Sequence, residues 1–214
     1  MQRTRDFDKR YRTGDLPWDT GRHDRNLELV IREYGIAPCT VLELGAGTGT
    51  DAIWLARKGF RVTAVDLSPT AVGMARKKAS AAGVEVEFIV ADILRDELPP
   101  GPFGFVFDRG CFHTFDLPEE RARLAETVWR RLGPGGHWFS LMGSADGPER
   151  EEGPPRRSAL DIVSAVEPWF EILLLRSTRF DSKLPEAPRS WACLMRKRDR
   201  VSTAPHTGEC RDTE

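Results

Sequence analysis

The sequence predicts an α/β fold: a doubly wound, mostly parallel seven-stranded sheet covered by helices, with an antiparallel edge strand. Two observations support this fold class. Short apolar runs rich in Val, Ile, Leu and Phe alternate with longer segments of helical period, as they do in parallel sheets that helices cover. The first of these runs leads directly into a glycine-rich turn, which is how such sheets connect a strand to the next helix.

The elements follow in order along the chain. Five strands are expected at residues 40–44, 61–65, 85–90, 103–108 and 136–142. Helices are expected between them at 50–58, 69–82 and 118–132, with Gly59, Gly83 and Gly133 placed where glycine favours helix termination. The segment from Gly143 to Pro155 indicates a surface loop or mobile lid. A helix at 158–166 then precedes two strands, at 170–175 and 190–195, that form an antiparallel pair at one sheet edge.

The length and charge of the chain limit the classes of function and partner that it can have. With 214 residues the chain suits one domain, placed at 24–197 between an N-terminal segment (1–23) and a tail (198–214) expected to be disordered. The 32 basic and 33 acidic residues argue against nucleic acid as a partner and favour a small molecule. Neither a secretory signal nor a membrane-spanning run is present, so we expect a cytoplasmic monomer or homodimer without membrane contact. The four scattered cysteines are expected to be free thiols, with no metal site.

An apolar strand runs straight into glycines at every second position, in the sequence Val41-Leu42-Glu43-Leu44-Gly45-Ala46-Gly47-Thr48-Gly49. Such glycines let the backbone turn tightly and approach a ligand, while the next helix offers free N–H groups. Asp66 ends the second strand, where a carboxylate can accept both hydroxyls of a ribose. Asp92 and Ile93 follow the third strand at the same sheet edge, where they can hold an adenine. Taken alone, the glycines are equally consistent with a tight turn and Asp92 with an N-cap; Glu43, Asp66 and the shared edge favour a Rossmann-like nucleotide site.

The glycine spacing distinguishes between two cofactors. A nicotinamide-binding loop normally has its third glycine one position later, where this chain has Thr50. S-adenosylmethionine (SAM) has no phosphate to bind, so a loop that offers backbone carbonyls and N–H groups suits its amino-acid end. The spacing therefore favours SAM over a nicotinamide cofactor.

Three motifs together resemble the signature set of class I SAM-dependent methyltransferases: Glu43 to Gly49, Val65-Asp66-Leu67-Ser68 and Leu132-Gly133-Pro134-Gly135-Gly136. Three more resemble the thiopurine S-methyltransferase superfamily, which includes halide and thiol methyltransferases: Pro17-Trp18-Asp19-Thr20-Gly21-Arg22, Phe107-Asp108-Arg109-Gly110 and Gly153-Pro154-Pro155. The resemblance implies that the N-terminal segment closes over the cofactor through Trp18, which could equally be a core anchor. It also implies that SAM, whose product is S-adenosylhomocysteine (SAH), is held by Trp18, Gly45, Ala46, Gly47, Thr48, Asp51, Asp66, Leu67, Asp92, Ile93 and Asp108.

Asp108, Arg109 and His113 cluster at the carboxyl end of the fourth predicted strand and are the catalytic candidates. Asp108 could position the methionine amino group or the substrate, Arg109 could attract an anionic acceptor, and His113 could accept a proton. The alternatives are a local ion pair for Asp108 and Arg109 and a packing role for His113. Arg156 and Arg157 follow the late loop and could line the acceptor entrance, although charged loop residues are usually solvated.

These motifs predict an enzyme that transfers a methyl group from SAM to a small nucleophile, preferably a thiol or another soft acceptor. Soft anions need little or no general base, whereas a hydroxyl or an ammonium needs one. The alternatives are an O- or N-methyltransferase of a small metabolite and a SAM-binding module without catalysis. A nicotinamide dehydrogenase is disfavoured by Thr50.

Overall fold

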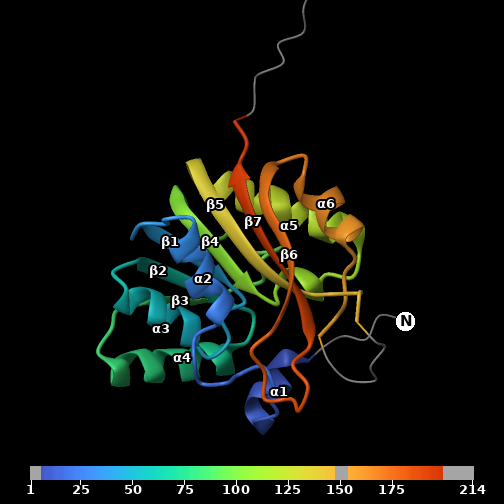
Figure 1. Ribbon diagram of the computed structural model, residues 1–214. Helices are drawn as coiled ribbons and strands as arrows, with labels where there is room; N and C mark the ends of the chain where they lie inside the picture. Colours follow the sequence, from blue (N-terminus) through green and yellow to red (C-terminus); the bar gives the residue numbers. More distant parts are fainter. Residues whose placement is uncertain (1–5, 148–153, 200–214) are drawn as a thin grey trace, which may run out of the picture.

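The computed structural model describes residues 6–147 and 154–199, and within them it confirms the predicted α/β fold (Figure 1). The seven strands form one sheet in the order β3-β2-β1-β4-β5-β7-β6. Their bounds are β1 Thr40–Leu44, β2 Arg61–Asp66, β3 Glu87–Val90, β4 Phe103–Arg109, β5 Leu132–Gly143, β6 Phe170–Arg179 and β7 Arg189–Lys197. The helices are α1 Phe7–Thr13, α2 Arg25–Glu33, α3 Thr50–Arg57, α4 Pro69–Ala82, η1 Phe112–Thr114, α5 Pro118–Arg131 and α6 Ala159–Val166.

The sheet is parallel from β3 to β5, and β7 runs antiparallel to both of its neighbours, β5 and β6. The predicted antiparallel pair of late strands is therefore confirmed. The strand that runs against the others is β7, which lies just inside the edge strand β6. The carboxyl ends of β1, β2, β3 and β4 all reach the same edge of the sheet, the lower one in Figure 1.

Two hydrophobic layers pack on opposite faces of the sheet. Helices α2, α3 and α4 contribute apolar side chains to one layer, while α5 and α6 contribute to the other. Strand β4 alternates between them, since Phe105 and Phe107 belong to the first layer and Val106 to the second, as the period of two in a strand requires. The central strands are consequently buried on both faces, and their ends stay in fixed positions.

Local signals explain why α4 has the predicted bounds. The side-chain oxygen of Ser68 accepts a hydrogen bond from Ala71 N at 3.0 Å, Pro69 occupies the first turn, and Gly83 ends the helix in the left-handed conformation. The expectation for Gly133 was wrong. Helix α5 ends at Arg131 and Leu132 is already extended, because buried Leu132 pairs with Phe103 of β4.

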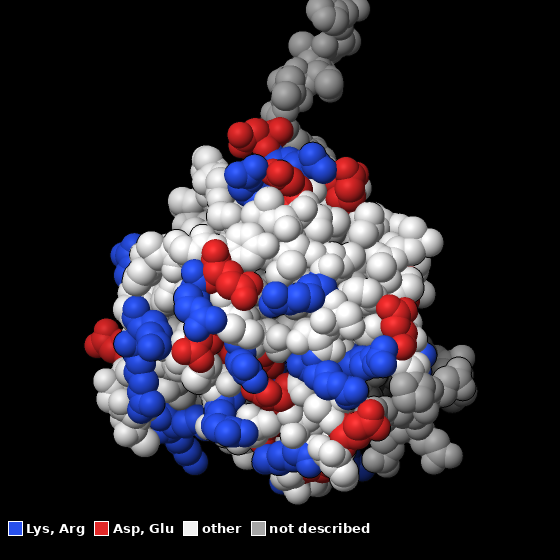
Figure 2. Space-filling view, in the orientation of Figure 1, with Lys and Arg blue, Asp and Glu red and all other residues white. Residues whose placement is uncertain are grey.

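Some predictions fall on residues that the structure does not describe: part of the loop at 143–157, most of the tail after residue 198, and Cys210. The other three cysteines are free thiols, as expected. Within the described residues, no helix is long and apolar enough to cross a membrane. Figure 2 shows acidic and basic side chains interspersed over one face of the molecule.

Candidate functional site

The glycine loop, residues 45–49, connects β1 to α3 at the carboxyl edge of the sheet. Gly45, Gly47 and Gly49 have φ angles of 66°, 56° and 74°, in the left-handed region that favours glycine. Space is limited as well. A Cβ atom added at Gly47 would lie 2.8 Å from the hydroxyl oxygen of Tyr11. The loop therefore needs glycine at this position for its backbone conformation and for the close approach of the N-terminal segment.

Asp66, the last residue of β2, holds the glycine loop in place. Its Oδ2 accepts a hydrogen bond from Gly47 N at 2.7 Å, and its Oδ1 accepts one from Ser68 N at 2.8 Å. The side chain is buried, and burial raises its pKa above the usual value despite these two hydrogen bonds. Each oxygen accepts one backbone N–H and keeps a second lone pair, so the carboxylate can still accept ribose hydroxyls.

The residues predicted to hold the adenine lie beside Asp66. Asp92 follows β3 and forms a turn, in which its Oδ1 accepts a hydrogen bond from Leu94 N at 2.9 Å. Ile93 is buried, whereas Leu67 is 58% exposed and presents an apolar surface at this edge. Asp92 thus has a structural role in this turn, and its contact with the cofactor stays a prediction.

Thr48 and Asp51 make contacts with the N-terminal segment, residues 6–24. The hydroxyl of Thr48 donates to Asp19 Oδ2 at 2.7 Å and accepts from Lys78 Nζ at 2.6 Å. Asp51 Oδ1 accepts from Asp24 N at 2.7 Å, and burial raises the pKa of Asp51 to about 6. These two side chains, which were predicted to hold the cofactor, thus connect residues 6–24 to the glycine loop through Thr48 and to α3 through Asp51.

The N-terminal segment lies at the edge where the parallel strands end, with α1 visible below the sheet in Figure 1. Trp18 packs edge-to-face against Phe7 and Tyr11, with ring centroids 6.3 and 6.2 Å away, and the Arg10 guanidinium lies 4.4 Å from the Trp18 centroid. Sequence reasoning missed Tyr11, which is buried against Gly47. The signal was present in the spacing of Phe7 and Tyr11, which puts two aromatic rings on one face of a helix.

Asp108 lies near the end of β4, is fully buried, and accepts hydrogen bonds from three N–H groups of the protein. Its Oδ1 accepts hydrogen bonds from Cys111 N at 3.1 Å and Phe112 N at 3.0 Å, and its Oδ2 accepts one from Trp138 Nε1 at 2.9 Å. Burial outweighs these bonds and raises the pKa of Asp108 to about 6. This geometry fits a residue that shapes the turn after β4 better than one that contacts a ligand.

Arg109 connects three parts of the chain. Its Nε donates to Asp24 Oδ2 at 2.7 Å, one terminal nitrogen donates to Trp18 O at 3.1 Å, and the other donates to Asp181 O. Burial works against its charge, but Asp24 and Asp51 more than compensate and raise the pKa of Arg109. The guanidinium thus fastens the N-terminal segment and the segment after β6 to the end of β4.

His113 in η1 is 6% exposed and lies beside Gly143 at the end of β5. Its Nδ1 accepts a hydrogen bond from Gly143 N at 2.8 Å, which places the proton of the neutral ring on Nε2. The ring of Phe180 packs edge-to-face at 5.8 Å. In this state His113 is a hydrogen-bond donor at Nε2, whereas the sequence hypothesis needs a proton acceptor.

The two late arginines are tied to this end of the sheet. Arg157 donates to His113 O at 2.8 Å, to Phe115 O at 3.0 Å and to Asp116 Oδ1 at 2.7 Å. Arg156 donates to Ala145 O at 2.9 Å. Arg157 therefore anchors the late loop beside His113, and its side chain is only 12% exposed.

Glu43 of β1 differs from the other carboxyls at this edge. It is 3% exposed, and its Oε2 has no hydrogen-bond partner within the described part of the chain. Burial and the negative charges of Asp51 and Asp66 raise the pKa of Glu43 well above its usual range. A buried carboxyl without a partner fits a site that receives a cationic or hydrogen-bonding group of a ligand.

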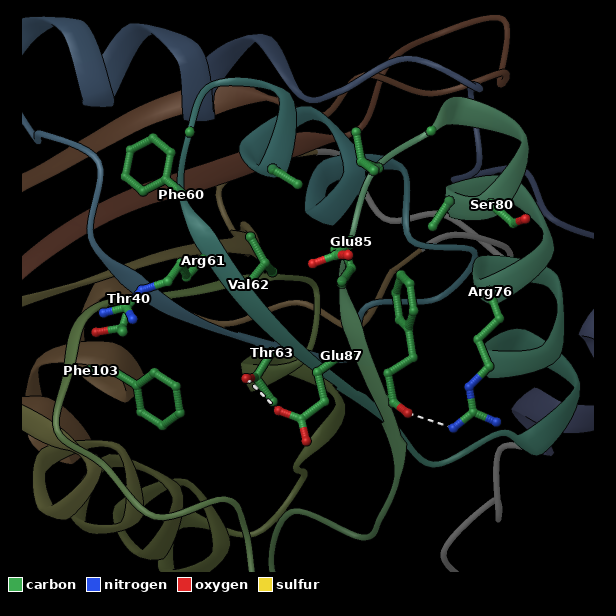
Figure 3. Close-up of a pocket in the computed structure, with 17 residues that line it drawn as sticks. Thr40, Phe60, Arg61, Val62, Thr63, Arg76, Ser80, Glu85, Glu87 and Phe103 are labelled. Atoms are coloured by element: carbon green, nitrogen blue, oxygen red, sulfur yellow. Dashed lines mark hydrogen bonds between the residues drawn. The ribbon is translucent and has the colours of Figure 1, made fainter.

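An open groove of about 1000 Å³ lies away from this edge. The first residues of β1, β2 and β4, which are Thr40, Arg61 and Phe103, are among those that line it (Figure 3). Two hydrogen bonds join residues of its lining, one from Thr63 Oγ1 to Glu87 Oε2 at 2.9 Å and one from the Arg76 guanidinium to Phe88 O at 2.6 Å (Figure 3). None of the predicted site residues lines this groove.

Comparison with known proteins agrees with the geometry of the carboxyl edge. Residues 41–136 match the family described as "Methyltransferase domain". Over 162 residues the chain is 33% identical to demethylmenaquinone methyltransferase of Thermus thermophilus, covering 75% of this chain and 64% of that one. It is 30% identical to probable thiol methyltransferase 2 of Arabidopsis thaliana over 151 residues, covering 70% and 65%. The chain thus spans just under two thirds of the length of both relatives.

One solved structure is similar over nearly the whole chain. It is described as "Conversion of a Disulfide Bond into a Thioacetal Group during Echinomycin Biosynthesis", with a TM-score of 0.80, 28% identity and 92% coverage of both chains. Together with the motifs from Glu43 to Gly49 and around Asp66, these findings show that residues 41–136 are similar to a methyltransferase domain, and they support S-adenosylmethionine as the cofactor.

Proposed function

We propose that this protein is a SAM-dependent methyltransferase that acts on a small molecule, with sulfur as the preferred acceptor atom. The single observation that carries the activity is the carboxyl edge itself, which brings together the glycine loop, Asp66 and Glu43, whose Oε2 has no partner among the described residues, with Tyr11 of the N-terminal segment packed against Gly47. The family match of residues 41–136 supports this assignment. Its motifs end before the late loop and leave the acceptor open.

The residues of this edge fit the cofactor. Asp66 retains acceptor capacity for ribose hydroxyls, Leu67 and Ile93 offer apolar surface for the base, and Glu43 offers a buried carboxyl to the amino-acid end. When bound, SAM supplies a methyl carbon already activated by its sulfonium. The chain contributes by binding, aligning the acceptor and excluding water. Tyr11, Asp19 and Arg109 serve the last of these tasks, because they hold the N-terminal segment over the glycine loop.

The engagement of the three catalytic candidates supports a sulfur acceptor. Asp108 is buried and accepts three N–H groups, Arg109 is a permanent cation, and His113 uses its Nδ1 lone pair on Gly143. None of the three therefore offers a ready general base. A thiol, with a pKa of about 8.5, loses its proton far more easily than an alcohol, so it can react without one. The descriptions of two similar proteins support the same acceptor, since one is described as a probable thiol methyltransferase and the other concerns the conversion of a disulfide bond.

The second candidate keeps the cofactor site and changes the acceptor to another atom of a small metabolite. The similarity to demethylmenaquinone methyltransferase favours it. Such an acceptor would need a proton removed, and His113 is the imidazole that the sequence hypothesis offers for this step.

The test combines binding with an acceptor panel. Calorimetry is expected to show SAH binding, and labelled SAM is expected to methylate small thiols faster than matched phenols and amines. Absence of SAH binding would refute the proposal. Methylation confined to phenols or amines, and lost in a folded His113→Ala protein that still binds SAH, would instead support the second candidate.

A further inference from the structure

The β6–β7 loop, residues 180–188, lies beside the N-terminal segment below the sheet (Figure 1). The two segments come from opposite ends of the chain and are bonded to each other. Pro17 O accepts a hydrogen bond from Lys183 N at 2.9 Å and one from Ser182 Oγ at 3.4 Å. Neither segment can therefore move away from the other without breaking these bonds.

The two segments also join the rest of the fold at adjacent points. The N-terminal segment runs into α2 at Arg25, and the loop leaves β6 after Arg179. Asn26 of α2 is buried and connects these points, because its side-chain nitrogen donates to Arg179 O at 3.2 Å and its side-chain oxygen accepts from Thr178 Oγ1 at 2.8 Å. A rotation about Asn26 would carry both segments in the same direction.

The first residues of the loop are held by the N-terminal side and by a single residue of the central strands. Asp181 Oδ2 accepts a hydrogen bond from Arg25 N at 3.3 Å, and Lys183 N donates to Pro17 O. Arg109 of β4 bonds to both segments at once, through Trp18 O and Asp181 O. If Arg109 let go, these loop residues would stay attached to the N-terminal segment.

Each segment contacts a different half of the carboxyl edge. Tyr11 of the N-terminal segment packs against Gly47 of the glycine loop, the half proposed for the cofactor. Phe180 of the β6–β7 loop is 8% exposed and packs edge-to-face on His113, with ring centroids 5.8 Å apart, in the half formed by β4 and β5. Because the segments are bonded to each other, the state of one half is communicated to the other.

We propose that the N-terminal segment and the β6–β7 loop form a single cover, which opens and closes as one unit about Asn26 with Arg109 as its latch. Exchange of the cofactor and access of the acceptor to His113 are then controlled by the same motion. A cofactor that stabilises the closed N-terminal segment also orders Phe180 on the acceptor side. This inference rests on the proposed function and adds a coupling between the two halves of its site.

Hydrogen exchange on the wild-type protein tests the shared motion. Amides that exchange through one opening share one opening free energy, and a ligand that binds only the closed form slows them all by the same factor. With SAH at about 100 times its dissociation constant, residues 16–24 and 180–185 are both expected to exchange about 100-fold more slowly. Residues 133–136 at the amino edge are the control and should not change. Protection of residues 16–24 alone would overturn the inference.

Two designed disulfides distinguish a single cover from two segments that move separately. Pro17→Cys with Lys183→Cys joins the two parts of the cover to each other. Asp8→Cys with Ser68→Cys joins the cover to α4, at a place where Ser68 Oγ donates to Asp8 Oδ1 at 2.5 Å. Oxidising the first pair is expected to change the SAH dissociation rate by less than about twofold, and oxidising the second to slow it about tenfold or more. Each oxidised protein is compared with its own reduced form, which controls for the substitutions.

The outcomes separate this inference from the proposed function. If the first disulfide slows SAH dissociation as much as the second, the N-terminal segment moves away from a stationary loop, and the single cover is wrong. If neither disulfide changes the rate, the cover does not control cofactor exchange, and the inference fails while the methyltransferase assignment stands. Where a disulfide does not form, the exchange measurement on wild-type protein decides. Failure of wild-type protein to bind SAH at all would overturn both.

Discussion

The charged side chains at the two edges of the sheet differ in their exposure to solvent. At the amino edge, the groove in Figure 3 is wide and open, and its charged residues, including Arg61, Arg76 and Glu87, are exposed. At the carboxyl edge, Glu43 and Asp66 are buried. Exposed charges are stabilised by water, whereas buried ones must find a partner or stay neutral. Buried polar groups that the protein does not fully satisfy are thus a better mark of a ligand site than the size of a hollow.

The largest effect is expected from Gly47→Val. A β-branched residue at φ 56° is strained, and its Cβ would meet the Tyr11 hydroxyl, so the variant should lose about 1–3 kcal/mol of unfolding free energy and its detectable SAH binding. Urea unfolding and calorimetry measure the two effects. Gly73→Ala is the control, because an added Cβ inside α4 meets no atom within 4 Å. Unchanged SAH affinity in Gly47→Val would show that the cofactor does not use this edge.

Arg109→Lys tests whether the N-terminal segment closes the site. A lysine cannot reach Asp24, Trp18 O and Asp181 O together, so we expect faster proteolysis within residues 6–24 and about tenfold weaker SAH binding, equivalent to about 1.4 kcal/mol. The exposed Arg130→Lys on α5 serves as the control. If only the Michaelis constant for an anionic acceptor rises and the proteolysis rate stays the same, Arg109 binds the acceptor, as the sequence hypothesis has it.

A smaller effect is expected from pH. Asp51 and Asp108 have folded-state pKa values of about 6, above the 3.8 of an ordinary aspartate, so the folded protein binds their protons more tightly than the unfolded chain does. Stability without ligand should therefore fall as pH rises through the interval between these two pKa values, by at most about 3 kcal/mol for each carboxyl. Asp108→Asn should reduce this pH dependence, whatever it does to stability at one pH. If urea unfolding gives the same dependence of unfolding free energy on pH for the variant and the wild type, the raised pKa of Asp108 is contradicted.

The smallest effect belongs to the amino edge. Arg61→Gln and Glu87→Gln change exposed charges in the groove of Figure 3, and we expect SAH affinity to change by less than about twofold because water screens such charges. A tenfold change in SAH affinity in either variant would indicate that the cofactor binds at the amino edge instead.

Local sequence was enough for the order and type of the elements in the main sheet. The bounds of β1 and α4 agree with prediction, because an apolar run between polar residues fixes the first and Ser68 and Gly83 cap the second. Prediction failed where contacts with residues distant in the sequence determine the local structure. Gly133 lies inside β5 because Leu132 pairs with Phe103, and short α1 is held by contacts of Tyr11 and Asp8 with residues far along the chain.

By itself, the sequence determined the fold class and the type of cofactor, because both depend on neighbouring residues: apolar periodicity, and glycines spaced within one turn. Only the tertiary structure decided which acidic side chain keeps a free oxygen. Asp108 and Glu43 both stand near the ends of apolar strands, yet Trp138, 30 positions away, helps to satisfy Asp108, while Glu43 Oε2 stays unpartnered among the described residues. Arg109 likewise bonds to groups 72 to 91 positions away. Hydrogen-bond partners at such separations are set by the packing of the whole sheet and its covering segments, which no local pattern encodes.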